Sequence, residues 1–217
     1  MTVVEPRLTL ERRLLREHTV IIACDEVGRG ALAGPVAVGA AVVGPRTSRR
    51  RVPQGLRDSK LVSEMRRAEV AARAADWVDA TAVGWSTAAE IDEVGIMRAL
   101  GRAALRAIEQ LRGVVAFDGA LVLLDGNYDY ISACGGTLPV RTQIKADRDC
   151  ASAAAASVVA KVARDALMVG LHTEHPAYEW SHNKGYASPA HRAAIRAVGL
   201  SPYHRASWAI SDAPTLF

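Results

Sequence analysis

Residues 19–30 read Thr-Val-Ile-Ile-Ala-Cys-Asp-Glu-Val-Gly-Arg-Gly, and no other stretch says as much about the fold. The apolar run at its start predicts a buried strand. Two adjacent carboxylates, Asp25 and Glu26, end that strand, and the turn Gly28-Arg29-Gly30 follows. Carboxylates are hard oxygen ligands for Mg²⁺ or Mn²⁺, and glycines let a backbone approach a ligand closely. Taken alone, an acidic strand end that caps an ordinary turn is the simpler interpretation, so the rest of the chain has to decide.

Length and composition indicate one domain without a membrane segment. The 217 residues suit a single domain, 1–217, with a sheet and helix core at about 19–170 and a helical portion at about 171–217. The apolar runs are too short to cross a bilayer, and the polar N-terminus has no signal-peptide core. Three cysteines without a CxxC pair argue against a disulfide framework. We therefore expect a cytoplasmic monomer.

The charged residues allow a nucleic-acid partner. The formal net charge is +4, which permits such a partner without requiring one. Arginine and alanine dominate, as in proteins from GC-rich genomes, and the few lysines are Lys60, Lys145, Lys161 and Lys184. Lysine offers a compact ammonium where arginine offers a planar fork. These four positions are therefore candidates for phosphate or carboxylate contacts, with chance as the competing explanation.

Strand and helix signals alternate along the chain. Strands are expected first, then strands alternating with helices, then helices alone, which predicts a mixed α/β sheet flanked by helices with a helical C-terminal portion. A short turn between the first two strands indicates a hairpin. The helix signals are N-caps, a capping box at Thr87 and Glu90, and a proline start with a glycine stop. The expected strands are 19–22, 35–43, 77–86, 120–124 and 139–144, and the expected helices are 64–75, 87–111, 151–171 and 189–198.

Three of the predicted strands lead into acids. Asp25 and Glu26 follow the first, Asp125 follows the fourth and Asp147 follows the fifth. Because sites in α/β sheets gather at strand ends, these acids could converge. Four carboxylates around one point repel each other unless cations neutralise them. Two divalent metals about 4 Å apart would do so and would clamp an in-line attack of water on a phosphodiester.

Each of these acids also has a simpler interpretation. Asp125-Gly126-Asn127 has the composition of an ordinary turn. Asp147 could be an acid at the start of a helix, where it faces the helix dipole. Asp149 lies two residues further on and competes with Asp147 for the fourth ligand position.

The order of the motifs resembles the type 2 ribonucleases H (ribonuclease HII), of bacterial type. The resemblance begins at Asp25-Glu26-Val27-Gly28-Arg29-Gly30 and spans about residues 19 to 208. The further motifs are Asp58-Ser59-Lys60, Glu90-Ile91-Asp92-Glu93, Leu124-Asp125-Gly126-Asn127, Lys145-Ala146-Asp147, the run 155–165, Asn183-Lys184-Gly185-Tyr186 and His204-Arg205-Ala206-Ser207-Trp208. One such motif is weak evidence, whereas the whole set in order is specific.

The resemblance implies a ribonuclease H-like fold and a two-metal, Mg²⁺- or Mn²⁺-dependent endonuclease. Its partners would be RNA–DNA hybrids and duplex DNA that contains a single ribonucleotide. It would cut on the 5′ side of the ribonucleotide and leave 3′-hydroxyl and 5′-phosphate ends. The metal-binding catalytic acids would be Asp25, Glu26, Asp125 and Asp147, since the family pattern places the last acid two residues after Lys145.

The resemblance also implies a set of nucleic-acid contacts. The backbone of Gly28, Arg29 and Gly30 would face the 2′-hydroxyl that distinguishes RNA from DNA. Tyr186 would assist by stacking on the next sugar, although a half-buried tyrosine is the commoner outcome. The remaining implied contacts are Lys60 and Lys184 to phosphates, together with Asn127 and Ser157. Ser157 and Lys161 share a helix face that either supports the acids or touches the nucleic acid; we favour support.

Two rival functions and one weak partner signal remain. Another nuclease of the ribonuclease H-like superfamily would keep the acids without needing the Gly28-Arg29-Gly30 turn and Tyr186. A non-catalytic nucleic-acid-binding module would keep its affinity after loss of Asp25 and Asp125. The tail Thr215-Leu216-Phe217 faintly resembles motifs that dock on the sliding clamp, and a frayed terminus is the default interpretation.

Overall fold

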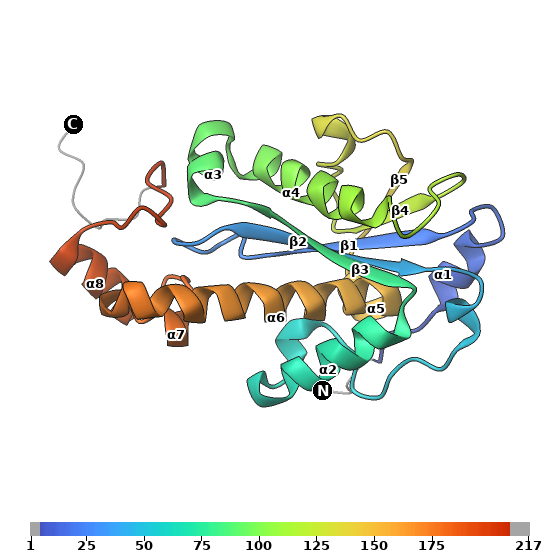
Figure 1. Ribbon diagram of the computed structural model, residues 1–217, viewed down its shortest axis with the longest axis horizontal. Coiled ribbons are helices and arrows are strands. Elements are labelled where there is room, and N and C mark those ends of the chain that lie inside the picture. The colour runs from blue at the N-terminus through green and yellow to red at the C-terminus, as the bar shows by residue number, and fades with distance from the viewer. Residues whose placement is uncertain (1–4, 209–217) are drawn as a thin grey trace.

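A mixed sheet in the strand order β3-β2-β1-β4-β5 forms the centre of the molecule. The computed structural model describes residues 5–208 (Figure 1). The antiparallel part consists of β1 (Ile21–Val27), β2 (Val36–Val43) and β3 (Ala80–Ser86). On the other side of β1, β4 (Leu121–Asp125) and β5 (Val140–Gln143) run parallel to it. The predicted mixed sheet and the hairpin of its first two strands are confirmed.

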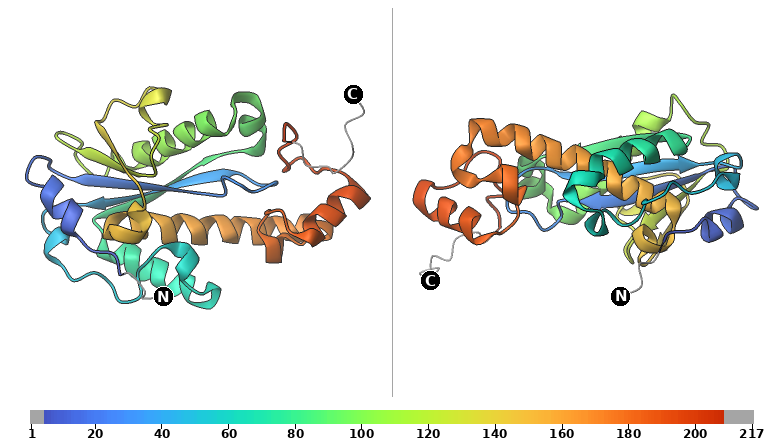
Figure 2. Two further views of the ribbon diagram at one scale, coloured as in Figure 1. Left: turned by 180° about the vertical axis from the view of Figure 1, so that it is seen from behind. Right: turned by 90° about the horizontal axis from the view of Figure 1, so that it is seen from below.

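Helices cover both faces of this sheet, as Figure 1 shows. One face carries α4 against β2 and β3, and the other carries α6 against β1 and β2, with α2 packed outside α6. The last helices lie beyond the end of the sheet, around the C-terminal end of α6 (Figure 2). The helices are α1 (Thr9–Leu14), α2 (Glu64–Trp77), α3 (Ala88–Val94), α4 (Ile96–Leu111), α5 (Ala146–Asp149), α6 (Ala151–Glu174), α7 (Trp180–Asn183) and α8 (Pro189–Val198).

Small residues bring the helices unusually close to the sheet. A Cβ at Gly39 in β2 would overlap the carbonyl oxygen of Ala156 in α6. A Cβ at Gly84 in β3 would overlap the carbonyl oxygen of Ala103 in α4. The alanine run that begins α6 is completely buried, so alanine content reflects close helix–sheet packing. These contacts press α6 onto β2, the neighbour of the acid-bearing strand β1, and α4 onto β3.

The structure differs locally from the sequence prediction at four places. The expected long helix 87–111 is two helices, because Gly95 adopts φ 79° between α3 and α4. Trp77 ends α2 instead of starting a strand. Ser63 takes the N-cap position of α2 without a side-chain hydrogen bond, whereas the capping box of Thr87 and Glu90 is formed. Asp147 lies in the short helix α5 rather than at a strand tip.

The short helix α1 is absent from the sequence prediction, and it supports the start of α6. Buried Glu11 accepts hydrogen bonds from the backbone nitrogen and the hydroxyl of Ser152, at 2.9 and 2.7 Å. Six residues are too few for a periodic signal. Within residues 5–208, no helix is both long and apolar enough to cross a bilayer.

The close contact of β3 with α4 gives a stability test. We expect Gly84→Ala to lower the free energy of unfolding by about 1–3 kcal/mol, since the added methyl must displace helix backbone. Gly170→Ala is the matched control, because nothing lies within 4 Å of its added Cβ and alanine is the better helix former, by about 0.5–1 kcal/mol. Urea unfolding of both variants measures the difference. A Gly84→Ala protein as stable as the parent would contradict this account of the packing.

Candidate active site

The acids lie at the carboxyl ends of β1 and β4 and at the start of α5. The parallel pairing of β1 and β4 ends with Cys24 opposite Leu124, so Asp25 and Asp125 are the next residues on neighbouring strands. Asp125 Oδ1 accepts hydrogen bonds from the backbone nitrogens of Ala146 (2.6 Å) and Asp147 (3.3 Å). These two amides tie the first turn of α5 to β4. Asp147 is thereby held beside Asp125.

Burial raises the pKa of every acid in this group, and for Asp25, Glu26 and Asp147 the charges of neighbouring acids raise it further. For Asp25, which is only 6% exposed, burial raises the pKa well above its ordinary value and the charge of Glu26 adds to it. Burial followed by the charge of Asp125 raises the pKa of Asp147 to about 6. Burial also raises the pKa values of Glu26 and Asp125. The structure therefore brings the four predicted acids into one electrostatic cluster.

Lys60 and Asp58 complete the surroundings of the acids. Lys60 Nζ lies 3.8 Å from Asp147 Oδ2. Partial burial lowers the pKa of Lys60, but the nearby carboxylates, Asp58 first, outweigh it and raise that pKa. Asp58 also caps the turn by accepting from the backbone nitrogen of Lys60 at 2.9 Å. Asp149 instead pairs through both oxygens with Arg148, at 2.7 and 2.8 Å, which favours Asp147 as the fourth acid.

The donor set fits a hard divalent cation. Carboxylates that raise each other's pKa are stabilised when a cation neutralises them, and Mg²⁺ and Mn²⁺ prefer oxygen ligands. Among residues 5–208, no group of three or more His, Cys, Asp or Glu side chains has the geometry of a ready-made metal cage. A dedicated cage is not required, because Mg²⁺ is usually held by one or two carboxylates together with waters and substrate phosphates.

The turn after β1 is fastened to a second loop. Gly28 adopts φ 84°, which favours glycine, whereas Arg29 and Gly30 are exposed. Arg29 Nη1 lies 3.6 Å from Glu26 Oε1, so the turn also touches the acids. Further along, the carbonyl of Gly185 accepts from the backbone nitrogens of Leu32 and Ala33 at 2.8 and 3.2 Å. The sequence motifs at 28–30 and 183–186 are therefore neighbours in space.

The loop 183–186 presents Tyr186 beside α6. Lys184 and Gly185 both have positive φ, at 51° and 83°, which turns the chain sharply before Tyr186. The Tyr186 ring lies 5.6 Å from Lys161 Nζ and 5.4 Å from the guanidinium carbon of Arg164. Lys184 itself is buried, with Nζ 3.0 Å from Glu64 Oε1. In this structure its ammonium is thus engaged by protein oxygens.

Ser157 in α6 lies next to Asp25. Its hydroxyl is hydrogen-bonded to the Asp25 carboxyl group, and this bond lowers the Asp25 pKa against the larger effect of burial. The same hydroxyl lies 3.0 Å from Ser59 Oγ. Lys161, one turn along α6, pairs with Asp165 at 2.8 Å. Asn127 is exposed after β4.

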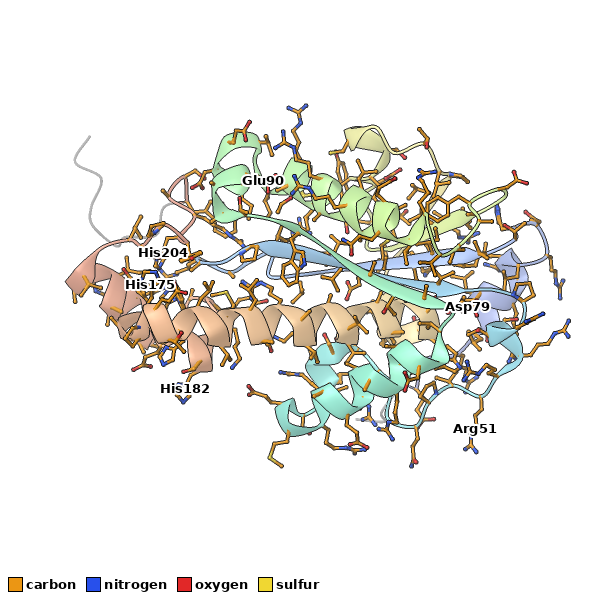
Figure 3. All side chains as sticks on the ribbon, in the orientation of Figure 1. Arg51, Asp79, Glu90, His175, His182 and His204 are labelled. Carbon is orange, nitrogen blue, oxygen red and sulfur yellow. The ribbon has the colours of Figure 1, made fainter. Side chains whose placement is uncertain are left out.

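A chain of buried hydrogen bonds through His204 and His191 ends at the backbone carbonyl of Tyr186. The backbone nitrogen of Ser201 donates to His204 Nδ1 at 2.9 Å, which leaves His204 Nε2 to donate to His191 Nε2 at 3.1 Å. His191 Nε2 also accepts from Trp180 Nε1, so His191 Nδ1 donates to the Tyr186 carbonyl at 2.9 Å. Figure 3 places His204 next to His175 at the end of α6. The backbone of Tyr186 is thus anchored by two neutral imidazoles.

Some residues inside the sequence motifs have a part in the site that the sequence did not predict. Arg164 and Arg205 lie inside motifs quoted above, yet they are two of 23 arginines (27 lysines and arginines less four lysines), and their type gave no reason to single them out from the other 21. Both are completely buried and hydrogen-bonded to the turn 28–35. For His191 and His204 the sequence favours a structural or phosphate-facing position over that of a metal ligand, without naming a partner for either. Only contacts between distant segments identify these residues as part of the site.

Comparison with known proteins relates this chain to one family. The family model described as "Ribonuclease HII" matches residues 22–211. A curated relative from Streptomyces avermitilis, named Ribonuclease HII, is 47% identical over 212 residues, which cover 96% of this chain and 86% of the relative.

Two solved structures share the fold. The PCNA:RNase HII complex from Archaeoglobus fulgidus matches with a TM-score of 0.69 and 23% identity, over 87% of this chain and 95% of that chain. Bst-RNase HIII in complex with Mn²⁺ matches with a TM-score of 0.73 and 18% identity, over 95% of this chain and 72% of that chain. At these identities the likeness shows a common fold.

The histidine chain predicts a loss of stability in acid. Burial first, then the charge of His191, lowers the pKa of His204 to about 4, and burial lowers that of His191. The unfolded chain therefore binds more protons between about pH 6.5 and pH 4, so this contribution is complete above pH 6.5 and is lost as the pH falls. Each unit of pKa difference is worth about 1.4 kcal/mol.

The measurement is urea unfolding of the parent and of His204→Gln from pH 7.5 to pH 4. The difference in unfolding free energy between the parent and His204→Gln should shrink toward pH 4. The acids with raised pKa affect both proteins equally, so their opposite pH dependence cancels in this difference. The exposed His182 provides the control, because His182→Gln should follow the parent throughout. A difference between parent and His204→Gln that does not vary with pH would exclude neutral buried imidazoles.

Proposed function

The chain belongs to the ribonuclease HII family and is a hydrolase of the ribonuclease H type, and we propose that it is a divalent-metal-dependent endoribonuclease with two related substrates. These substrates are the RNA strand of RNA–DNA hybrids and duplex DNA with a single embedded ribonucleotide. Cleavage falls on the 5′ side of the ribonucleotide. The observation that carries this proposal is the position of the turn 28–30 directly beside the four-acid cluster, with Arg29 3.6 Å from Glu26.

The acids have the role of holding cations. Asp25, Glu26, Asp125 and Asp147 provide the carboxylate oxygens, and bound Mg²⁺ or Mn²⁺ supplies Lewis-acid activation of water and of the phosphodiester. The structure of Bst-RNase HIII with Mn²⁺ supports such a cofactor. The phosphorus–O3′ bond breaks, which leaves a 3′-hydroxyl and a 5′-phosphate. No side chain has to act as a nucleophile, and Lys60 offsets part of the negative charge.

The choice of substrate depends on one hydroxyl group. RNA and DNA differ at the 2′ position, and the Gly28-Arg29-Gly30 backbone, assisted by Tyr186, faces it in this proposal. Lys60 and Lys184 contact phosphates, which position a duplex without reading its sequence. For Lys184, a phosphate would replace the carboxylate of Glu64 that now lies 3.0 Å away. Asn127 and Ser157 complete the set, Ser157 through its bond to Asp25.

A clamp contact and a cytoplasmic location belong to the same proposal. The matched PCNA:RNase HII complex supports a sliding-clamp contact in general terms. The tail Thr215-Leu216-Phe217 to which we assign it lies outside the described residues.

Cleavage of a labelled DNA duplex with one ribonucleotide tests the proposal. We expect one cut, 5′ to the ribonucleotide, with Mg²⁺ or Mn²⁺ and none with EDTA. Asp125→Asn should lower the rate by a factor of about 10²–10³, the range for loss of one group that stabilises a transition state. Asp129→Asn is the matched control, because Asp129 Oδ1 only accepts from the backbone nitrogens of Ile131 and Ser132 and asparagine keeps that acceptor.

The outcomes separate the rival functions. A cut in a continuous RNA–DNA hybrid but not at a single ribonucleotide would keep the metal chemistry and remove the assigned role of the turn 28–30. Binding without any metal-dependent cleavage would indicate a nucleic-acid-binding module.

The raised pKa values also predict how cation affinity depends on pH. Because the pKa of Asp147 lies at about 6 without a cation, protons compete with the metal below that pH. Mn²⁺ affinity, measured by titration calorimetry, should be nearly constant above pH 7 and should fall steeply below pH 6. The binding heat should also depend on the ionisation enthalpy of the buffer near pH 6, because bound protons are released. Pronounced Mn²⁺ binding that does not change between pH 5 and pH 7.5 would contradict this account.

A further inference from the structure

Two buried arginines hold the turn that follows β1. Arg205, from the segment after α8, donates from Nη1 to the carbonyl of Arg29 at 2.8 Å and from Nη2 to the carbonyl of Gly28 at 2.6 Å. Its Nε and Nη2 also lie 3.3 and 3.2 Å from the carbonyl of Gly34. One side chain therefore fastens three carbonyls of the turn 28–35.

Arg164, from α6, fastens the other half of the same turn. Its Nε donates to the carbonyl of Pro35 at 2.9 Å and its Nη2 to the carbonyl of Ala33 at 3.1 Å. Its Nη1 donates to the carbonyl of Lys184 at 2.9 Å, which couples the turn to the loop 183–186. Gly28 sits directly on this guanidinium, since a Cβ there would overlap Arg164 Nε.

Because the peptide group is planar, the contacts of Arg205 with the carbonyls also determine where the N–H groups of Arg29 and Gly30 point. In a trans peptide the carbonyl of one residue and the N–H of the next point in opposite directions. Because the carbonyls of Gly28 and Arg29 point inward to Arg205, the N–H groups of Arg29 and Gly30 point away from it. Within residues 5–208, neither N–H donates a hydrogen bond. Two adjacent donors are thus presented on the exposed side of the turn.

We propose that Arg164 and Arg205 are positioning residues that hold the amides of Arg29 and Gly30 toward the ribose 2′-oxygen and so set the preference for ribonucleotides. This inference rests on the proposed function and deepens it, because it assigns the discrimination to groups that do not touch the substrate. The planar fork of arginine reaches several carbonyls at once, whereas a lysine ammonium has no such fixed arrangement of donors.

The hydrogen bonds of the two guanidiniums go to backbone carbonyl groups. Both side chains are completely buried, and neither forms a salt bridge with a described acid. Burial first, then the charge of Arg164, lowers the pKa of Arg205 to about 9, so the group stays charged near neutral pH. Buried charges are rare unless a specific arrangement compensates them. Here the compensation is the set of carbonyls of the turn 28–35, together with the carbonyl of Lys184.

Equilibrium binding in an Asp125→Asn background, with Mg²⁺ present, tests the proposal. The two probes are a labelled DNA duplex with one ribonucleotide and the same duplex made entirely of DNA. We expect Arg205→Lys and Arg164→Lys each to reduce the ratio of the two dissociation constants about tenfold, as the loss of about 1.4 kcal/mol of discrimination. The dissociation constant for the all-DNA duplex should stay within a factor of about two, since phosphate contacts are retained.

Arg50→Lys is the matched control, because Arg50 also donates to a carbonyl, that of Trp77 at 2.6 Å, but in another part of the fold. It should leave the ratio unchanged. A purely structural role for Arg164 and Arg205 would lower the melting temperature and weaken both probes equally. An unchanged ratio in a folded Arg205→Lys protein would overturn the proposal.

A second measurement needs no arginine variant. In the ¹H–¹⁵N spectrum of the Asp125→Asn protein, the amides of Arg29 and Gly30 should shift with the ribonucleotide duplex and much less with the all-DNA duplex. Equal shifts with both probes would overturn the proposal even if the lysine variants fail to fold. If the Asp125→Asn protein does not prefer the ribonucleotide duplex at all, the proposed function itself fails, which is a different result from a preference that survives Arg205→Lys.

Discussion

Four carboxylates share one end of the sheet, and their mutual repulsion is the constraint that the surrounding structure has to satisfy. The parallel register of β1 and β4 places Asp25 and Asp125 on adjacent strands. The first amides of α5 then bind Asp125 and draw Asp147 to the same place. Lys60 supplies a counter-charge 3.8 Å away. The pKa values of the acids remain raised in spite of these contacts. The negative charge of the cluster is therefore only partly neutralised by the protein itself.

The turn 28–35 and the loop 183–186, which face the ribose in the proposed function, depend on a different kind of interaction. Carbonyls of the turn 28–35 bind two buried guanidiniums, and the carbonyl of Tyr186 binds His191. Cations or neutral imidazoles thus hold backbone oxygens from inside the molecule. The backbone amides and the Tyr186 ring are left for contacts on the other side. In the proposed function, metal chemistry and sugar recognition therefore lie side by side, and each has its own set of supporting residues.

The sequence predicted the acids better than their supports. Asp25 and Asp125 follow short apolar strands, so a local pattern locates them. Arg205 is far from Gly28 in the chain, and no local pattern links a lone arginine to a distant turn. The mixed sheet and the hairpin were predicted because alternation and turn residues are local signals. The break at Gly95 was underestimated, since its positive φ ends α3 although the apolar pattern continues. The six-residue α1 gave no periodic signal at all.

The helix α6 joins the two halves of the site as one continuous element. Ser157 contacts Asp25 near its start, and Arg164 holds the turn and the loop 183–186 about 10 Å further along, at 1.5 Å per residue. An α-helix keeps such a separation nearly constant. In the proposed function, α6 therefore works as a ruler: it determines how many phosphates separate the recognised sugar from the bond that breaks. The distance from the recognised sugar to the cut is then set by the length of α6 between these two contacts, and it does not depend on the surrounding nucleotide sequence.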